Sequence, residues 1–204
     1  MTGDVVCIVG GAPSYRQAPY GDPGARIWGL GMHWTYLPRV DRVFEMHDRS
    51  IWSDYLGQDP GRYAARLASA DVPVVMREAH PDVPRSEAFP FDAVEARFGD
   101  VAAEPGPALY GSSFDYMLAY ALTRDPLPAE LRLYGIHMDE GREYAHQRPS
   151  ASYWIGLARG MGVPVWIHPD AADLCRTPNP YGSRAWFGAG ADDAPRRRHV
   201  ETAA

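Results

Sequence analysis

The most informative absence in this 204-residue sequence is lysine, because all twenty of its basic residues are arginine. The chain therefore has no Walker-type phosphate lysine, no lysine for a Schiff base with a carbonyl substrate or pyridoxal phosphate, and no lysine general base. Positive charge is also scarce overall, since the net charge is −6. That balance argues against a dedicated nucleic-acid binder held by global charge, while a local arginine patch stays compatible with the sequence.

Cysteine and long hydrophobic runs are scarce as well. Cys7 and Cys175 cannot form a disulfide framework, and we expect both to be reduced, packed thiols. The longest apolar runs are about five residues, whereas a membrane helix needs about 20. The first residues also lack the basic and then apolar order of a signal peptide. We therefore expect a soluble, cytoplasmic protein that does not bind membranes.

Hydrophobic residues make up 46% of the chain, which is enough for a sizeable core. Short apolar runs typical of strands alternate with segments that have helical spacing. The strand-like runs are 5–9, 26–30, 42–46, 73–76, 131–136 and 163–167, and the helical segments are 64–70, 112–123 and 150–160. This alternation predicts an α/β fold: a Rossmann-like open, mostly parallel sheet with helices on both faces.

We expect residues 1–176 to form that single nucleotide-binding domain. Residues 177–204 are rich in Gly, Pro and Arg, and we expect them to form a poorly ordered tail. The arginines at 196–198 are typical of a solvated terminal cluster, with contact to nucleic acid as the alternative.

The first candidate site follows the first strand and consists of Gly10, Gly11, Ala12, Pro13 and Ser14. Two glycines let a ligand approach the backbone closely, and amides that turn toward a following helix can bind a phosphate. We assign Gly10, Gly11, Pro13 and Ser14 to nucleotide binding, although an ordinary strand-to-helix turn would use similar residues.

Two further candidates lie where other elements begin or end. His47 follows the strand at 42–46 and is a candidate acid or base, or a ligand for a phosphate; alternation sends Phe44 and Glu45 to opposite faces of the sheet. Ser112 and Ser113 open the helix at 112–123, where hydroxyls and free amides suit a phosphate or a ribose. His33 is expected to be structural or exposed.

The densest polar segment, 137–148, follows the strand at 131–136, and we expect it to be a loop on the acceptor side. His146 and Asp139 are candidate acid or base groups. Arg142, Tyr144 and Arg148 are candidates for binding the phosphate or the acceptor. Acidic and histidine side chains in this segment could also bind a divalent metal, but their spacing matches no specific metal motif, so we assign no metal ligands.

Taken together, these segments resemble a family of uncharacterised phage and prophage proteins over about residues 4–176. The motifs that carry the resemblance are 5–14, 28–30, 41–47, 111–113 with 116–117, 133–136, 143–149 and 153–156. More distantly, their order is similar to that of the bacterial sialyltransferases of glycosyltransferase family 42. It is also similar to a related group that includes archaeal hydroxymethylpterin pyrophosphokinases.

In those families a Gly-x-Gly-Pro-Ser loop binds the nucleotide, and a serine-rich helix start contributes to the same pocket. A strand that ends in Gly-(Ile/Val)-Asp precedes a histidine on the acceptor side. This chain has Gly-Gly-Ala-Pro-Ser at 10–14 instead, and His137 stands where the families usually have Asp.

The resemblance implies a nucleotide-dependent transferase, glycosyltransferase-like, that moves a group from a nucleotide-activated donor to an acceptor hydroxyl of a glycan or a modified DNA base. The donor is a substrate, and no tightly bound cofactor is expected. One alternative is pyrophosphoryl transfer of the pterin type, which would need Mg²⁺ held by carboxylates such as Asp139, Glu140 and Glu143. The other is a phage protein that senses nucleotides or binds a partner without catalysis.

Overall fold

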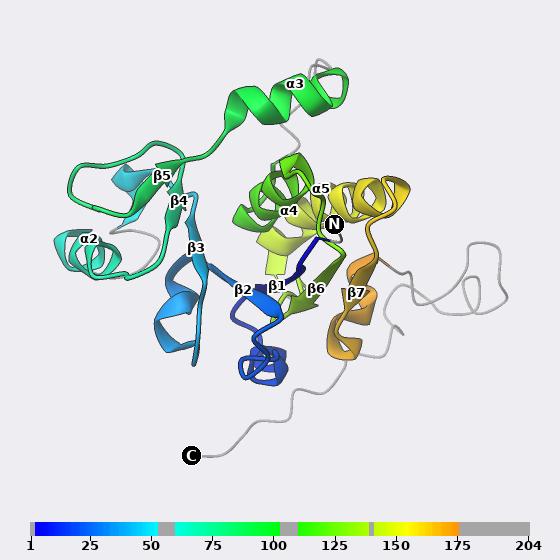
Figure 1. Cartoon of the computed structure of the whole chain (residues 1–204), viewed down its shortest axis with the longest axis horizontal. Helices are drawn as coiled ribbons and strands as arrows, with labels where there is room; N and C mark the ends of the chain where they lie inside the picture. The colour runs from blue at the N-terminus through cyan, green and yellow to red at the C-terminus, as the bar shows by residue number, and fades with distance from the viewer. Residues whose placement is uncertain (1–2, 53–59, 103–109, 139–140, 176–204) are drawn as a thin grey trace, which may run out of the picture. The chain divides into compact units, whose positions relative to one another are not determined.

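The computed structural model of this chain describes residues 3–52, 60–102, 110–138 and 141–175 (Figure 1). Its strands and α-helices lie in one compact unit, Met1–Leu174. The tail expected at 177–204 lies outside the described residues, so the boundary after residue 176 stays a prediction.

The core of the fold is a seven-stranded sheet with the order β5-β4-β3-β2-β1-β6-β7, in which every pair of neighbours is parallel. The strands are β1 (Val5–Val9), β2 (Ala25–Leu30), β3 (Arg42–Glu45), β4 (Val74–Met76), β5 (Ser86–Ala88), β6 (Glu130–Tyr134) and β7 (Val165–Ile167). This confirms the predicted Rossmann-like α/β class. β1 lies between β2 and β6, and four of its five residues, Val6–Val9, have no exposed surface.

Helices cover both faces of the sheet (Figure 1). The α-helices are α2 (Pro60–Ala68), α3 (Phe91–Ala102), α4 (Ser113–Thr123) and α5 (Gly141–Gly160). The short 3-10 helices are η1 (Pro13–Gln17), η2 (Gly31–Tyr36), η3 (Arg49–Ile51) and η4 (Pro169–Cys175). Adjacent residues of β3 show the two layers: Val43 packs in the cluster around α2, whereas Phe44 contacts Tyr120 of α4 at 5.3 Å between ring centroids.

Two predictions of local structure were wrong. β5 was missed because its sequence, Ser-Glu-Ala, has no apolar run; it forms only by pairing with β4 at the edge of the sheet. The polar segment 141–148 belongs to α5 and not to a loop. We had expected a helix to begin near Ser150, but Pro149 lies inside α5, where it removes one backbone donor without ending the helix.

The described helices include none that is long and apolar enough to cross a membrane. Cys7 is buried in β1, and burial raises the pKa of its thiol to about 11. That thiol is therefore protonated at neutral pH, as expected for a packed and unreactive cysteine.

The fold predicts opposite effects for two glycine-to-alanine changes. Gly135 has a φ of +66°, and a Cβ there would lie 2.6 Å from the carbonyl oxygen of Gly10. Gly135→Ala should therefore lower the free energy of unfolding in urea by about 2 to 4 kcal/mol, through both strain and contact. Gly156, within α5, has open space around its Cα, so Gly156→Ala should raise stability by about 0.5 to 1 kcal/mol. Equal effects of the two variants would contradict this packing.

Candidate functional site

The candidate site lies at the carboxyl edge of the sheet, where the strand order reverses. β1 pairs with β2 on one side and with β6 on the other. The chain leaves β1 toward β2 and leaves β6 toward β7, so these two connections run in opposite directions from neighbouring strand ends. Ligands of open parallel sheets bind outside the carboxyl ends of the strands at such a reversal. The segments that follow β1, β2, β3 and β6 therefore form the candidate site.

The segment after β1 is bound directly to the segment after β6. The amide of Gly10 donates to the carbonyl oxygen of Tyr134 at 2.9 Å, and the amide of Ala12 donates to that of Gly135 at 3.0 Å. The Oγ of Ser14, which is fully buried, accepts from the amide of Gly135 at 2.8 Å. Two amides of the predicted phosphate loop and its serine hydroxyl thus join the two segments together.

His137 takes part in the same contact. Its Nε2 lies 2.9 Å from the Oγ of Ser14, so the residue that replaces the usual Asp of the resembling families is hydrogen bonded to the glycine-rich segment. Gly10 is required by this packing, since a Cβ there would lie 2.6 Å from the carbonyl oxygen of Gly135. Pro13 begins η1, where its missing N–H costs no hydrogen bond.

Gly11 is covered by His33, a residue that sequence reasoning left as structural or exposed. A Cβ at Gly11 would lie 2.5 Å from Cε1 of the His33 ring. The ring is held by the Tyr36 hydroxyl, 2.7 Å from its Nδ1. Burial lowers the pKa of His33, and the charge of Glu45 opposes this effect without cancelling it. The lowered pKa favours a neutral imidazole at neutral pH.

His47 is oriented by a buried carboxylate at the end of β3. The side chain of Glu45 has no exposed surface. Its Oε1 lies 2.6 Å from Nδ1 of His47 and accepts from the backbone amide of His47 at 3.0 Å. When Glu45 is ionised it can only accept, so Nδ1 carries the proton and any proton exchanged with a substrate passes through Nε2. The structure thus contains a His–carboxylate pair. The alternation of side chains along β3 did not predict this contact.

Gly31 brings β2 close to this pair. It has a φ of +50°, and a Cβ there would lie 3.8 Å from Oε2 of Glu45 and 4.0 Å from Cε1 of His47. The left-handed turn at Gly31 begins η2, which carries His33 back over Gly11. The ends of β1, β2 and β3 are therefore joined through Gly11, His33, Glu45 and His47.

The start of α4 already holds a negative group of the protein itself. Oδ2 of Asp115 accepts from the amides of Gly111 and Ser112 at 2.7 and 2.9 Å, and from the Ser150 hydroxyl of α5 at 2.7 Å. Burial raises the pKa of Asp115 to about 6, against the opposing effect of these hydrogen bonds. A phosphate at Ser112 and Ser113, both half-buried, would thus lie beside a carboxyl group that accepts from the two amides preceding α4.

The turn of α5 that contains His146 packs against this helix start. A Cβ at Gly111 would lie 2.7 Å from Oγ of Ser150 and 3.5 Å from the carbonyl oxygen of His146. The side chain of His146 is exposed. The backbone of His146 therefore lies beside Gly111, the residue before Ser112, and the role of His146 stays a prediction.

The remaining candidates of the polar segment are placed only in part. Nε of Arg148 donates to the carbonyl oxygen of Met138, so this arginine holds the chain between β6 and α5. Arg142 and Tyr144 lie in the first turn of α5, and the structure describes only their backbone. Asp139 lies outside the described residues, and its role stays a prediction.

The polar segment was also a candidate for a divalent metal site. Within 3–52, 60–102, 110–138 and 141–175 there is no group of three or more His, Cys, Asp or Glu side chains that could hold a metal ion. Of the carboxylates named for Mg²⁺, Asp139 and Glu140 lie outside these ranges, and the Glu143 side chain is not described. We derive no step that passes through a metal.

Asp115 predicts a specific dependence of stability on pH. Because its pKa is higher in the folded chain than the ordinary aspartate value of 3.8, the native state binds this proton more tightly than the unfolded state. The contribution of Asp115 to the free energy of unfolding should then fall by up to about 3 kcal/mol between about pH 4 and pH 7. Asp115→Asn keeps an oxygen to accept from the amides and does not titrate. Urea unfolding of both proteins at several pH values measures the difference, and a difference independent of pH would contradict the assignment.

Comparison with known proteins gives a likeness of fold only. No family model and no curated protein matches the chain. Among solved structures, it is similar to the sialyltransferase CstII from Campylobacter jejuni in complex with the substrate analogue cytidine-5'-monophosphate: 14% identity, a TM-score of 0.49, and coverage of 87% of this chain and 81% of that chain. A second structure of CstII, in complex with CMP-3FNeuAc, gives 12% identity, a TM-score of 0.49, and coverage of 80% and 79%. At this level of similarity no residue role is carried over, and the likeness to phage proteins and pterin kinases stays a prediction.

Proposed function

We propose that this protein is a transferase that moves a glycosyl group from a nucleotide-activated donor to an acceptor hydroxyl, with His47 as the general base. The observation that carries the proposal is the imidazole of His47 bound through Nδ1 to the fully buried Glu45 at the carboxyl end of β3. An imidazole held by a carboxylate is a common arrangement for a base that must accept a proton at neutral pH.

The proposed reaction consists of one proton transfer and one displacement at the anomeric carbon of the donor. His47 takes the proton of the acceptor hydroxyl through Nε2, and Glu45 stabilises the resulting imidazolium. The acceptor oxygen forms a bond to the anomeric carbon of the donor. The bond from that carbon to the phosphate oxygen breaks, and the nucleotide leaves with the electron pair.

The donor would lie beside Gly11 and His33, close to where the sheet order reverses. A neutral His33 can donate a hydrogen bond to a phosphate oxygen, which suits a chain that has no lysine for this purpose. Ser112, Ser113, Arg142, Tyr144 and Arg148 are the further residues that we propose near the donor or the acceptor. A glycan and a modified DNA base both present suitable hydroxyls.

His146 is the competing base, and it provides the matched control for His47. Both are histidines near the carboxyl edge, but His146 is exposed on α5 whereas the His47 ring is bound to a buried carboxylate. His47→Gln should lower turnover by about 10²- to 10⁴-fold and leave donor binding nearly unchanged, because the base contacts the acceptor. His146→Gln should have a much smaller effect. The reverse order of effects would transfer the role of base to His146.

The donor is identified by a thermal-shift screen of nucleotides and nucleotide sugars, with and without Mg²⁺. A nucleotide sugar at about 100 times its Kd should raise Tm by several degrees, since binding adds about 2.7 kcal/mol to the free energy of unfolding. The proposal expects this shift without Mg²⁺. A shift that requires Mg²⁺ would favour pyrophosphoryl transfer instead, and no shift with any nucleotide would favour a partner-binding role.

A further inference from the structure

Tyr63 of α2 is the residue that reaches the site from the core. Its side chain is almost fully buried, and its hydroxyl donates to Oε2 of Glu45. The two oxygens of this carboxylate therefore serve two different partners: Oε1 binds His47 and Oε2 binds Tyr63. Sequence reasoning missed Tyr63, because nothing in the local pattern of α2 indicates a partner 18 residues away.

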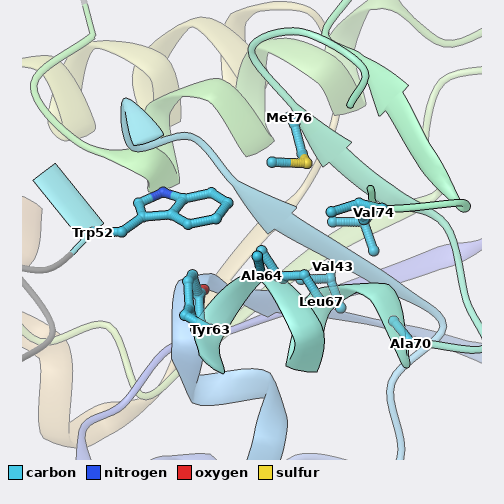
Figure 2. Close-up of a cluster of buried hydrophobic side chains, with 9 residues drawn as sticks. Val43, Trp52, Tyr63, Ala64, Leu67, Ala70, Val74 and Met76 are labelled. Carbon is cyan, nitrogen blue, oxygen red and sulfur yellow. The ribbon is translucent and has the colours of Figure 1, made fainter. Parts of the chain in front are cut away.

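The hydrophobic cluster around α2 fixes the position of the Tyr63 ring (Figure 2). The Trp52 ring meets it edge-on, with 5.1 Å between centroids and an interplanar angle of 88°. Tyr63, Ala64 and Leu67 lie on one face of α2 and pack against Val43 of β3 and Val74 of β4. Because the Tyr63 ring is tightly packed, its hydroxyl has one position, and its hydrogen bond therefore fixes the Glu45 carboxylate.

Among the residues that the structure describes, titratable groups approach Glu45 from three parts of the chain. His47 follows β3, Tyr63 belongs to α2, and His33 on η2 is close enough for the charge of Glu45 to raise its pKa against the larger effect of burial. Burial and the Glu45 charge together raise the pKa of Tyr63 far above its usual range, so its hydroxyl stays protonated and donates to Glu45. The hydroxyl of Tyr63 therefore stabilises the ionised carboxylate without exchanging a proton with it.

We propose that Tyr63 is a positioning residue for His47: its hydroxyl holds the Glu45 carboxylate and thereby sets the orientation and the basicity of the imidazole. The inference deepens the proposed function and rests on His47 as the base. A carboxylate that shares its charge with a second donor attracts the imidazolium less strongly than one that does not. The Tyr63 hydroxyl should therefore keep His47 a weaker base than Glu45 alone would make it.

The test compares Tyr63→Phe with Leu67→Ala. Tyr63→Phe removes one oxygen and keeps the ring, and it should raise the pKa of His47 by about 0.5 to 1 unit. The acidic limb of kcat/KM should move to higher pH by the same amount, which lowers kcat/KM about 3- to 10-fold at the acidic end. Leu67→Ala removes side-chain volume from the same buried cluster and retains Tyr63, Glu45 and His47. It should lower Tm and leave both the His47 titration and the pH profile in place.

The pKa of His47 is read from its imidazole signals by NMR, assigned with His47→Gln, so this measurement does not depend on finding the substrate. A Tyr63→Phe protein whose His47 pKa is unchanged or lowered overturns the inference, as does a Leu67→Ala protein with the same upward shift. Should Tyr63→Phe not fold, Glu45→Gln tests the effect of the carboxylate on His47. Loss of the negative charge should lower the His47 pKa, and an unchanged pKa would overturn the inference. An inactive enzyme with the expected NMR shifts would refute the proposed function alone.

Discussion

The burial of one carboxylate, Glu45, is the constraint on which the arrangement of the site depends. A charge in the interior costs several kcal/mol unless hydrogen bonds replace its lost water. Glu45 meets that requirement with the amide and Nδ1 of His47 on one oxygen and the hydroxyl of Tyr63 on the other. These partners come from different elements, so the position of α2 and the end of β3 are fixed by the same group that orients the candidate base.

A second constraint joins the central strands at the same edge of the sheet. Gly10 and Gly135 approach so closely that neither position has room for a side chain, and the buried Ser14 hydroxyl connects the segments that follow β1 and β6. The left-handed turn at Gly31 then brings His33 over Gly11 and places β2 beside Glu45. Gly10, Gly11 and Ser14, which the sequence singled out for binding, are thus among the residues that stabilise the carboxyl edge. In this protein the stability of that edge and the shape of the site depend on the same contacts.

The sequence predicted the elements whose signals are local. Continuous apolar residues marked β1, and Ser112 with the apolar stripe behind it marked the start of α4. Asp115, three residues after Ser112, is also a local signal of a capping box, which we did not use. β5 could not be predicted because only its partner β4 makes it a strand. The length of α5 was missed because Pro149 is typical of a boundary.

The sequence places several candidate residues at one edge of the sheet, but it does not give the contacts between them. Parallel topology places the ends of β1, β3 and β6 at one edge, so His47 and the segments after β1 and β6 were expected there. The ring of His33 over Gly11 and the hydroxyl of Tyr63 on Glu45 depend on the packing of η2 and α2, which residue spacing does not encode.

The central claim is that the carboxyl edge of the sheet at Gly11, His33 and His47 binds a nucleotide-activated donor and its acceptor. The most direct measurement is a crystal structure of the protein with a nucleotide sugar that stabilises it in solution. The account predicts the phosphate groups beside Gly11 and His33, with the transferable carbon facing Nε2 of His47. A donor bound elsewhere, with His47 remote from its reactive carbon, would contradict it.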